Sequence, residues 1–332
     1  MKNRSILRKC AAIAAFAVSA VLFLPEVLFA QGAVIGYAWG WEAEDSGDLS
    51  SYPTNDQLDK LTHVMACEVY PNWDGSLTYS FPNYWNGGKN DWLVSLVSRA
   101  HAKGVKVSLE VGGMSRDTFS LATHPSKLQY FVNNIVSFVH LHDLDGVDID
   151  WECPGLDSDW IPFPDENDRI AEWEQCIHLL TALKSALPCK RISIALSAYY
   201  PDDTDLFPNQ SVPAQVWNTV DAVHLMTYDN DSSNWYPHSS ATGAIDVIEY
   251  WANWGADWEI TYGVNLDKEK LFMGCAFYGH VYKPDGSFDW DIKNMLTYHP
   301  YPGRTPATAL QVWQSRSTTV TTMDMAVCVF GN

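Results

Sequence analysis

Residues 145–152 contain four acidic residues, and the last three of them alternate along the chain. Successive side chains of a β-strand point to opposite faces, so Asp148, Asp150 and Glu152 share one face. At a rise of about 3.3 Å per residue, neighbouring carboxyls on that face lie about 6.6 Å apart. In a confined space such a row retains at least one proton near neutral pH, which suits general acid–base chemistry.

The apolar residues of the same segment indicate where this strand lies. Val147, Ile149 and Trp151 occupy the opposite face and are expected to pack against helices. A run of acids can also be a solvated surface or a loose calcium site, but no ligand loop with a central glycine turn accompanies this one. Glu152 stands at the C-terminal end of the strand, where barrel enzymes carry their catalytic groups. We therefore interpret the acidic face as catalytic.

The elements around this segment alternate between β-rich runs and helical patterns, which predicts a parallel sheet with crossover helices. Helical periodicity is clearest at residues 128–138 and 170–187. The predicted strands are residues 33–39, 62–69, 105–111, 145–151, 191–198, 221–228 and 271–278.

Seven such units predict an α/β fold, a TIM (β/α)8 barrel whose eighth strand is divergent or missing at the C-terminus. Residues 323–330 are the candidate for that strand. A doubly wound sheet would need a glycine-rich phosphate turn after its first strand, and residues 36–40 do not form one.

The first 30 residues are predicted to be an export signal. A basic head ending at Lys9 precedes an uncharged, mostly apolar run at residues 11–24, and Ala30 offers a small residue before a cut. The apolar run is shorter than the roughly 20 residues that a membrane-spanning helix needs. We expect residues 31–332 to form a secreted catalytic barrel, extracellular or periplasmic, that has no membrane attachment after signal removal and acts as a monomer.

Composition and charge limit the classes of molecule that this chain can be expected to bind. The 332 residues include 21 basic and 40 acidic ones, and the net charge of −19 would repel nucleic acid. Flat aromatic faces can hold sugar rings, and the chain has 15 tryptophans and 16 tyrosines. A carbohydrate partner is predicted, and nucleic acid is not.

No metal or cofactor is expected. The chain contains no CxxC pair and no HExxH segment, and the pair His140 and His142 is interpreted as solvated surface. The six cysteines beyond residue 30 show no recognisable disulfide framework, so those in apolar strand-like runs are interpreted as buried free thiols.

The acidic segment Asp145-Gly146-x-Asp148-x-Asp150-x-Glu152 resembles the signature of the glycoside hydrolase family 18 chitinases, at the end of the fourth barrel strand. Further matches follow in the family's order along nearly the whole mature chain: Gly36-Tyr37, Gly112-Gly113, Met226-Thr227-Tyr228-Asp229 and Phe277-Tyr278-Gly279. The resemblance implies a secreted chitinase that hydrolyses β-1,4 linkages between N-acetylglucosamine units.

The resemblance also implies a retaining, substrate-assisted mechanism. Glu152 would be the general acid and then the base, and the carbonyl oxygen of the substrate's own N-acetyl group would be the nucleophile. Asp150 would hold the amide nitrogen, Asp148 would share a proton behind it, and Tyr228 would steady the acetyl group.

Residues around these acids are predicted to bind the sugar. The predicted substrate-binding set is Tyr37, Trp39, Gly112, Gly113, Met226, Asp229 and Tyr278. For Tyr37 and Met226, core packing is the competing interpretation. Further tryptophans considered as sugar platforms are Trp41, Trp73, Trp235 and Trp290, whereas alternation turns Trp151 toward the helices.

Two positions depart from the family pattern. Glu110 stands where the serine of the family's Ser-x-Gly-Gly motif is expected, and only Phe330 is available for the tryptophan of the eighth strand. Alternation points Glu110 into the barrel beside Asp148, and we predict that the two carboxyls share a proton. Replacing Glu110 with serine should then move the acidic limb of the pH–rate profile. The alternative is that Glu110 bends out to solvent or pairs with a basic side chain.

Two other functions fit the same segments. One is an endo-β-N-acetylglucosaminidase that acts on N-glycans or wall sugars, and the other is a non-catalytic chitin-binding lectin. Lectins of this type typically lose the acid at Glu152, which is present here together with the whole acidic set.

Overall fold

The computed structural model describes residues 33–40, 43, 50–81, 91–113, 116–151, 154, 166–197, 214–228, 241–245, 247–248, 268–276 and 327–329. Within these ranges the strands form a nine-stranded sheet in the order β8-β7-β6-β5-β4-β2-β1-β9, with β3 paired to β2. The strands are β1 Val34–Trp39, β2 His63–Pro71, β3 Leu77–Tyr79, β4 Lys106–Gly112, β5 Gly146–Asp150, β6 Arg191–Ser197, β7 Ala222–Met226, β8 Leu271–Met273 and β9 Val327–Val329.

Seven of these strands follow one another in chain order and run parallel, from β1 through β2, β4, β5, β6 and β7 to β8. Each overlaps one of the seven predicted strands, which confirms the predicted α/β fold of the TIM-barrel type. The barrel is incomplete among the described residues. The short β3 is antiparallel to β2 and was not predicted.

The predicted eighth strand has a divergent counterpart. Within residues 323–330, β9 pairs with β1 and also contacts β8, so it lies where a closing strand is expected. It is only three residues long and antiparallel to β1, whereas the last strand of a regular barrel runs parallel to the first.

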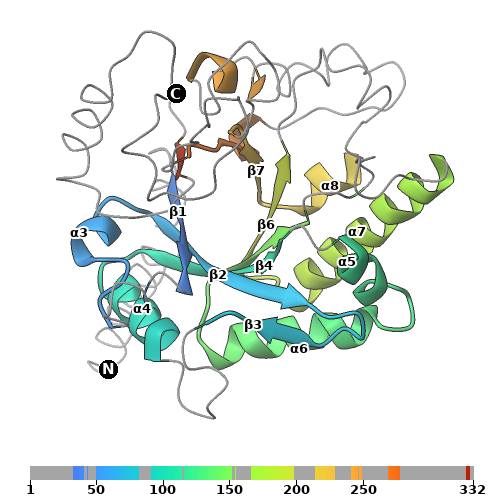
Figure 1. The fold of residues 1–332 in the computed structure, drawn as a ribbon, viewed down its shortest axis with the longest axis horizontal. Helices are drawn as coiled ribbons and strands as arrows, with labels where there is room; N and C mark the ends of the chain where they lie inside the picture. The colour runs from blue at the N-terminus through green and yellow to red at the C-terminus, as the bar shows by residue number, and fades with distance from the viewer. Residues whose placement is uncertain are drawn as a thin grey trace, which may run out of the picture.

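Helices surround the strands (Figure 1). They are α3 Asn55–Leu58, α4 Asp91–Ala102, α5 Arg116–Ala122, α6 Leu128–Leu141, α7 Glu166–Ala186 and α8 Ala214–Thr219, with a 3-10 turn, η4, at Lys268–Lys270. The predicted helical patterns at residues 128–138 and 170–187 fall in α6 and α7. No helix within the described ranges is long and apolar enough to cross a bilayer.

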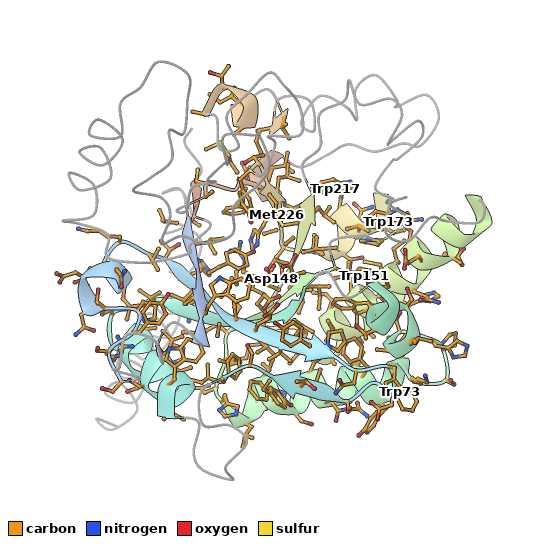
Figure 2. The ribbon with its side chains drawn as sticks, in the orientation of Figure 1. Trp73, Asp148, Trp151, Trp173, Trp217 and Met226 are labelled. Carbon is orange, nitrogen blue, oxygen red and sulfur yellow. The ribbon has the colours of Figure 1, made fainter. Side chains whose placement is uncertain are left out.

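The core lies between the outer face of the sheet and the helices. Alternating apolar residues of β4 and β5, such as Leu109 and Ile149, are fully buried together with Phe131 and Ile135 of α6. Trp151 is also fully buried and stacks on Phe119 of α5 with ring centroids 4.8 Å apart. The predicted packing of Trp151 toward the helices is therefore confirmed (Figure 2).

Candidate active site

Asp148 is the more enclosed of the two predicted catalytic acids that the structure describes. It lies on β5, near the middle of the sheet (Figure 2), and is 0% exposed. The Tyr37 hydroxyl donates a hydrogen bond to its Oδ2 at 2.6 Å. The Ser193 hydroxyl donates to its Oδ1 at 2.5 Å. Both oxygens of the carboxylate thus accept a hydrogen bond inside the protein.

His224 completes this network from β7. Its Nδ1 lies 2.7 Å from the Tyr37 hydroxyl and 3.2 Å from Oδ1 of Asp148. Because the Tyr37 hydroxyl donates its hydrogen bond to Asp148, its oxygen can accept a hydrogen bond from His224 Nδ1. The buried network therefore joins β1, β5, β6 and β7 across the inside of the sheet.

Sequence reasoning missed two members of this network, Ser193 and His224. Strand alternation carries a signal for His224, because it shares a face with Met226 two residues later. Alternation also predicts that Ser193 faces inward, but it does not predict that Ser193 contacts Asp148 on the neighbouring strand. Tyr37 was predicted as a substrate-binding residue that lies near Asp148; its hydroxyl does hold Asp148, and its contact with substrate stays a prediction.

These contacts set the ionisation of Asp148. Burial by itself would raise the pKa of this carboxyl, but the nearby His224 ring and the hydrogen bonds from His224, Ser193 and Tyr37 outweigh burial and hold the pKa below its ordinary 3.8. Asp148 is consequently a fixed carboxylate that accepts hydrogen bonds.

We expect Asp148→Asn to reduce the free energy of unfolding at neutral pH by about 1.5–3 kcal/mol, the usual contribution of a buried hydrogen bond to a charged group. A carboxyl whose folded pKa is depressed stabilises the fold above its unfolded pKa, and this stabilisation is lost as pH falls through the folded pKa. The difference between wild type and variant should therefore shrink as pH drops below 3.8.

Urea unfolding between about pH 7 and pH 2.5 measures this difference. Asp59→Asn is the matched control, because Asp59 is half-exposed and pairs with Lys103 on the surface. A wild-type advantage over Asp148→Asn that stays constant down to the lowest pH would contradict the assignment of an ionised Asp148.

Asp150 ends β5 two residues beyond Asp148 and is partly exposed. It is paired in register with Gly112 of β4, and its carbonyl accepts a hydrogen bond from the Gly113 backbone N–H at 3.1 Å. A Cβ on Gly112 would lie 2.2 Å from Cβ of Asp150, so only glycine allows the two strands this approach. Gly113 has a φ of +100° and turns the chain after β4. Both predicted substrate-binding glycines thus have a structural role, and their contact with substrate stays a prediction.

Glu110 lies where alternation predicted. It is paired in register with Asp148 and is 2% exposed. The prediction that it points into the barrel beside Asp148 is confirmed, and of the alternative the part in which Glu110 bends out to solvent is wrong. The shared proton stays a prediction.

Asp145, the first acid of the segment, lies at the opposite end of the strand. Its carboxylate accepts hydrogen bonds from the Val107 backbone N–H at 2.9 Å and from Lys106 at 3.0 Å, and it contacts His101 at 2.7 Å. Burial by itself would raise the pKa of Asp145, but these donors outweigh burial and hold the pKa below its ordinary value. This acid joins β5 to β4 and α4, which is a stabilising role.

The other predicted site residues fall into two groups. Trp39 and Met226 end β1 and β7, and both are partly buried, as is Tyr228 just after β7. A Cβ on Gly274 would lie 2.8 Å from the Tyr228 ring, so Tyr228 lies against the end of β8. Seven further predicted residues lie outside the described part of the chain: Glu152, Asp229, Tyr278, Trp41, Trp235, Trp290 and Phe330.

The interpretation of cysteines as buried free thiols holds for two of the described cysteines. Cys67 and Cys176 are buried free thiols, whereas Cys189 is free and exposed. The part of the chain that the structure describes contains no cluster of three side chains able to hold a metal ion.

Comparison with known proteins gives a consistent set of relatives. The model of "Glycosyl hydrolases family 18" matches residues 33–322. A chitinase-like effector of Moniliophthora roreri is 24% identical over 82% of this chain and 66% of its own length. Chitinase A1 of Niallia circulans is 26% identical over 64% of this chain and 31% of its own length. The chain therefore spans less than two thirds of the length of these relatives.

Solved structures show the same fold. A chitinase from Rhizomucor miehei is 26% identical with a TM-score of 0.53, covering 75% of this chain and 64% of that one. A chitinase from Bacteroides thetaiotaomicron is 22% identical with a TM-score of 0.56, covering 77% of this chain and 70% of that one.

Proposed function

Since this chain belongs to glycosyl hydrolases family 18, we propose that it is a secreted chitinase that hydrolyses β-1,4 linkages between N-acetylglucosamine units. One observation carries the proposal: a buried, ionised Asp148 stands directly below Asp150 on β5, at the end of the strand where barrel enzymes do their chemistry. Secretion rests on the basic head and apolar run of the first 30 residues.

The proposed chemistry is substrate-assisted and retaining. Glu152 protonates the glycosidic oxygen while the acetyl carbonyl oxygen of the substrate attacks the anomeric carbon and closes an oxazolinium ion. Asp150 accepts a hydrogen bond from the amide N–H, which aims the acetyl group. Glu152 then takes a proton from the incoming water, and the product keeps the configuration of the substrate.

The enclosed Asp148 supports the role of Asp150. A fixed negative charge two residues behind Asp150 stabilises the positive charge that develops on the oxazolinium. Because Tyr37, Ser193 and His224 hold Asp148 from three other strands, this charge needs no reorganisation during the reaction.

We expect purified protein lacking residues 1–30 to cleave N-acetylglucosamine oligomers of defined length and to release the β-anomer first. Chromatography that resolves anomers, run within the first turnovers, measures both outcomes. Initial release of the α-anomer would contradict the retaining mechanism. Tight binding of the oligomers without any cleavage would instead support a chitin-binding lectin, and cleavage confined to N-glycan cores would support the endo-β-N-acetylglucosaminidase.

A further inference from the structure

Glu110 is a buried carboxyl in the barrel interior that belongs to none of the proposed catalytic roles. It lies on β4 opposite Asp148 and is 2% exposed. A carboxyl in such a place is costly unless it is protonated or well partnered. Its neighbours therefore decide what it can do.

The atoms around Gly112 locate the Glu110 carboxyl. A Cβ placed on Gly112 would lie 2.4 Å from Oε1 of Glu110 and 2.2 Å from Cβ of Asp150. The side chains of Glu110 and Asp150 thus meet over this glycine, and a larger residue there would push both aside. The Glu110 carboxyl is directed toward the outer end of β5, where Asp150 stands.

Asp148 is the less suitable partner for a proton held by Glu110. Its two oxygens already accept hydrogen bonds from Tyr37 and Ser193. His224, 3.2 Å away, further favours its charged form. A proton retained in this region therefore belongs with Glu110 and Asp150.

Two further carboxyls, Glu68 and Asp148, lie near this pair. Glu68 comes from β2, as does the Cys67 thiol, and Asp148 comes from β5, where it is contacted by Tyr37 of β1 and His224 of β7. Burial, then the charges of Glu110, Glu68, Asp150 and Asp148, raise the pKa of the Cys67 thiol. Several carboxyls thus act on one buried spot, and such crowding favours retention of a proton.

We propose that Glu110 is a positioning residue that keeps its proton and donates a hydrogen bond to the carboxylate of Asp150. The bond holds Asp150 so that it can accept from the amide N–H of the substrate. This inference rests on the proposed function. At high pH the pair loses its proton and two adjacent anions repel each other. At low pH a second proton neutralises Asp150.

The pH profile of kcat/KM for oligomer cleavage tests this role through two variants. Glu110→Gln keeps a donor that cannot ionise, so its acidic limb should stay in place, whereas its alkaline limb is that of the general acid Glu152. Glu110→Ser is too short to reach Asp150. Without the donor the pKa of Asp150 rises, so the acidic limb of this variant should move to higher pH.

Glu172→Gln is the matched control, because Glu172 is a buried carboxyl on α7 that accepts a hydrogen bond from Ser120, outside the barrel interior. Neither of its limbs should move. Thermal unfolding confirms that each variant is folded. An acidic limb of Glu110→Ser that stays where that of active wild type lies, or an equal shift in Glu172→Gln, overturns the proposal.

Infrared spectroscopy separates this inference from the proposed function. A wild type that cleaves no oligomer would overturn the function alone. In either case the C=O stretch of protonated carboxyls at neutral pH should be weaker by the contribution of one carboxyl in Glu110→Gln than in wild type and in Glu172→Gln, while the proton of the general acid Glu152 contributes equally in all three. The same band in Glu110→Gln at wild-type intensity overturns the assigned proton.

Discussion

Glu152→Gln is expected to lower kcat on N-acetylglucosamine oligomers by about 10²–10⁴-fold, the usual contribution of a general acid. Glutamine has the shape of glutamate and still forms hydrogen bonds, but it has no proton to give to the departing sugar oxygen. Folding and oligomer binding should be almost unchanged. Steady-state kinetics give kcat, and calorimetric titration of the same oligomer gives the affinity.

Glu174→Gln is a suitable control for Glu152→Gln. Glu174 is an exposed glutamate of α7, so its replacement removes one negative charge without touching the barrel interior. It should keep wild-type kcat. If Glu152→Gln also kept it, another group would have to be the acid, and the reading of the whole acidic segment would be wrong.

The strands that were predicted best from the sequence are those with one face packed against the helices and the other face turned into the barrel interior. In β4 and β5 apolar and polar residues alternate strictly, so the faces of Glu110 and Asp148 follow from local geometry. Their pairing also follows, since consecutive parallel strands of such a fold are neighbours. This part of the site needed no three-dimensional information.

The short strands were harder to predict for a physical reason. β3 has three half-buried residues and β9 has three in all, which is too few for an alternating pattern to stand out. The direction of β9 depends on how distant parts of the chain meet. Its antiparallel pairing with β1 therefore has no local signal.

The network around Asp148 shows a different limit. Alternation indicates that Tyr37, Ser193 and His224 face inward, but it does not say which inward residues meet. That depends on the stagger of the strands around the barrel. The prediction that Asp148 and Glu110 share a proton was made without this information, because the donors to Asp148 come from three other strands, and it stays a prediction.

Oligomers that lack the N-acetyl group on the reacting sugar are expected not to turn over, although they should still bind. In the proposed mechanism the acetyl oxygen is the nucleophile, held next to the anomeric carbon. Losing a well-oriented intramolecular nucleophile removes about 7–11 kcal/mol of barrier lowering, a factor of about 10⁵–10⁸. Matched fully acetylated and deacetylated oligomers of equal length measure the effect, and a thiazoline mimic of the oxazolinium should inhibit competitively.

The enclosure of Asp148 sharpens this expectation. With 0% exposure and both oxygens occupied by Tyr37 and Ser193, Asp148 is not able to attack a sugar. Asp150 is only partly buried, so it is the described carboxylate of β5 that could act as an enzyme nucleophile instead. Such a nucleophile would not need the acetyl group. Efficient cleavage of a fully deacetylated oligomer, abolished by Asp150→Asn, would therefore replace the substrate-assisted mechanism with covalent catalysis at Asp150.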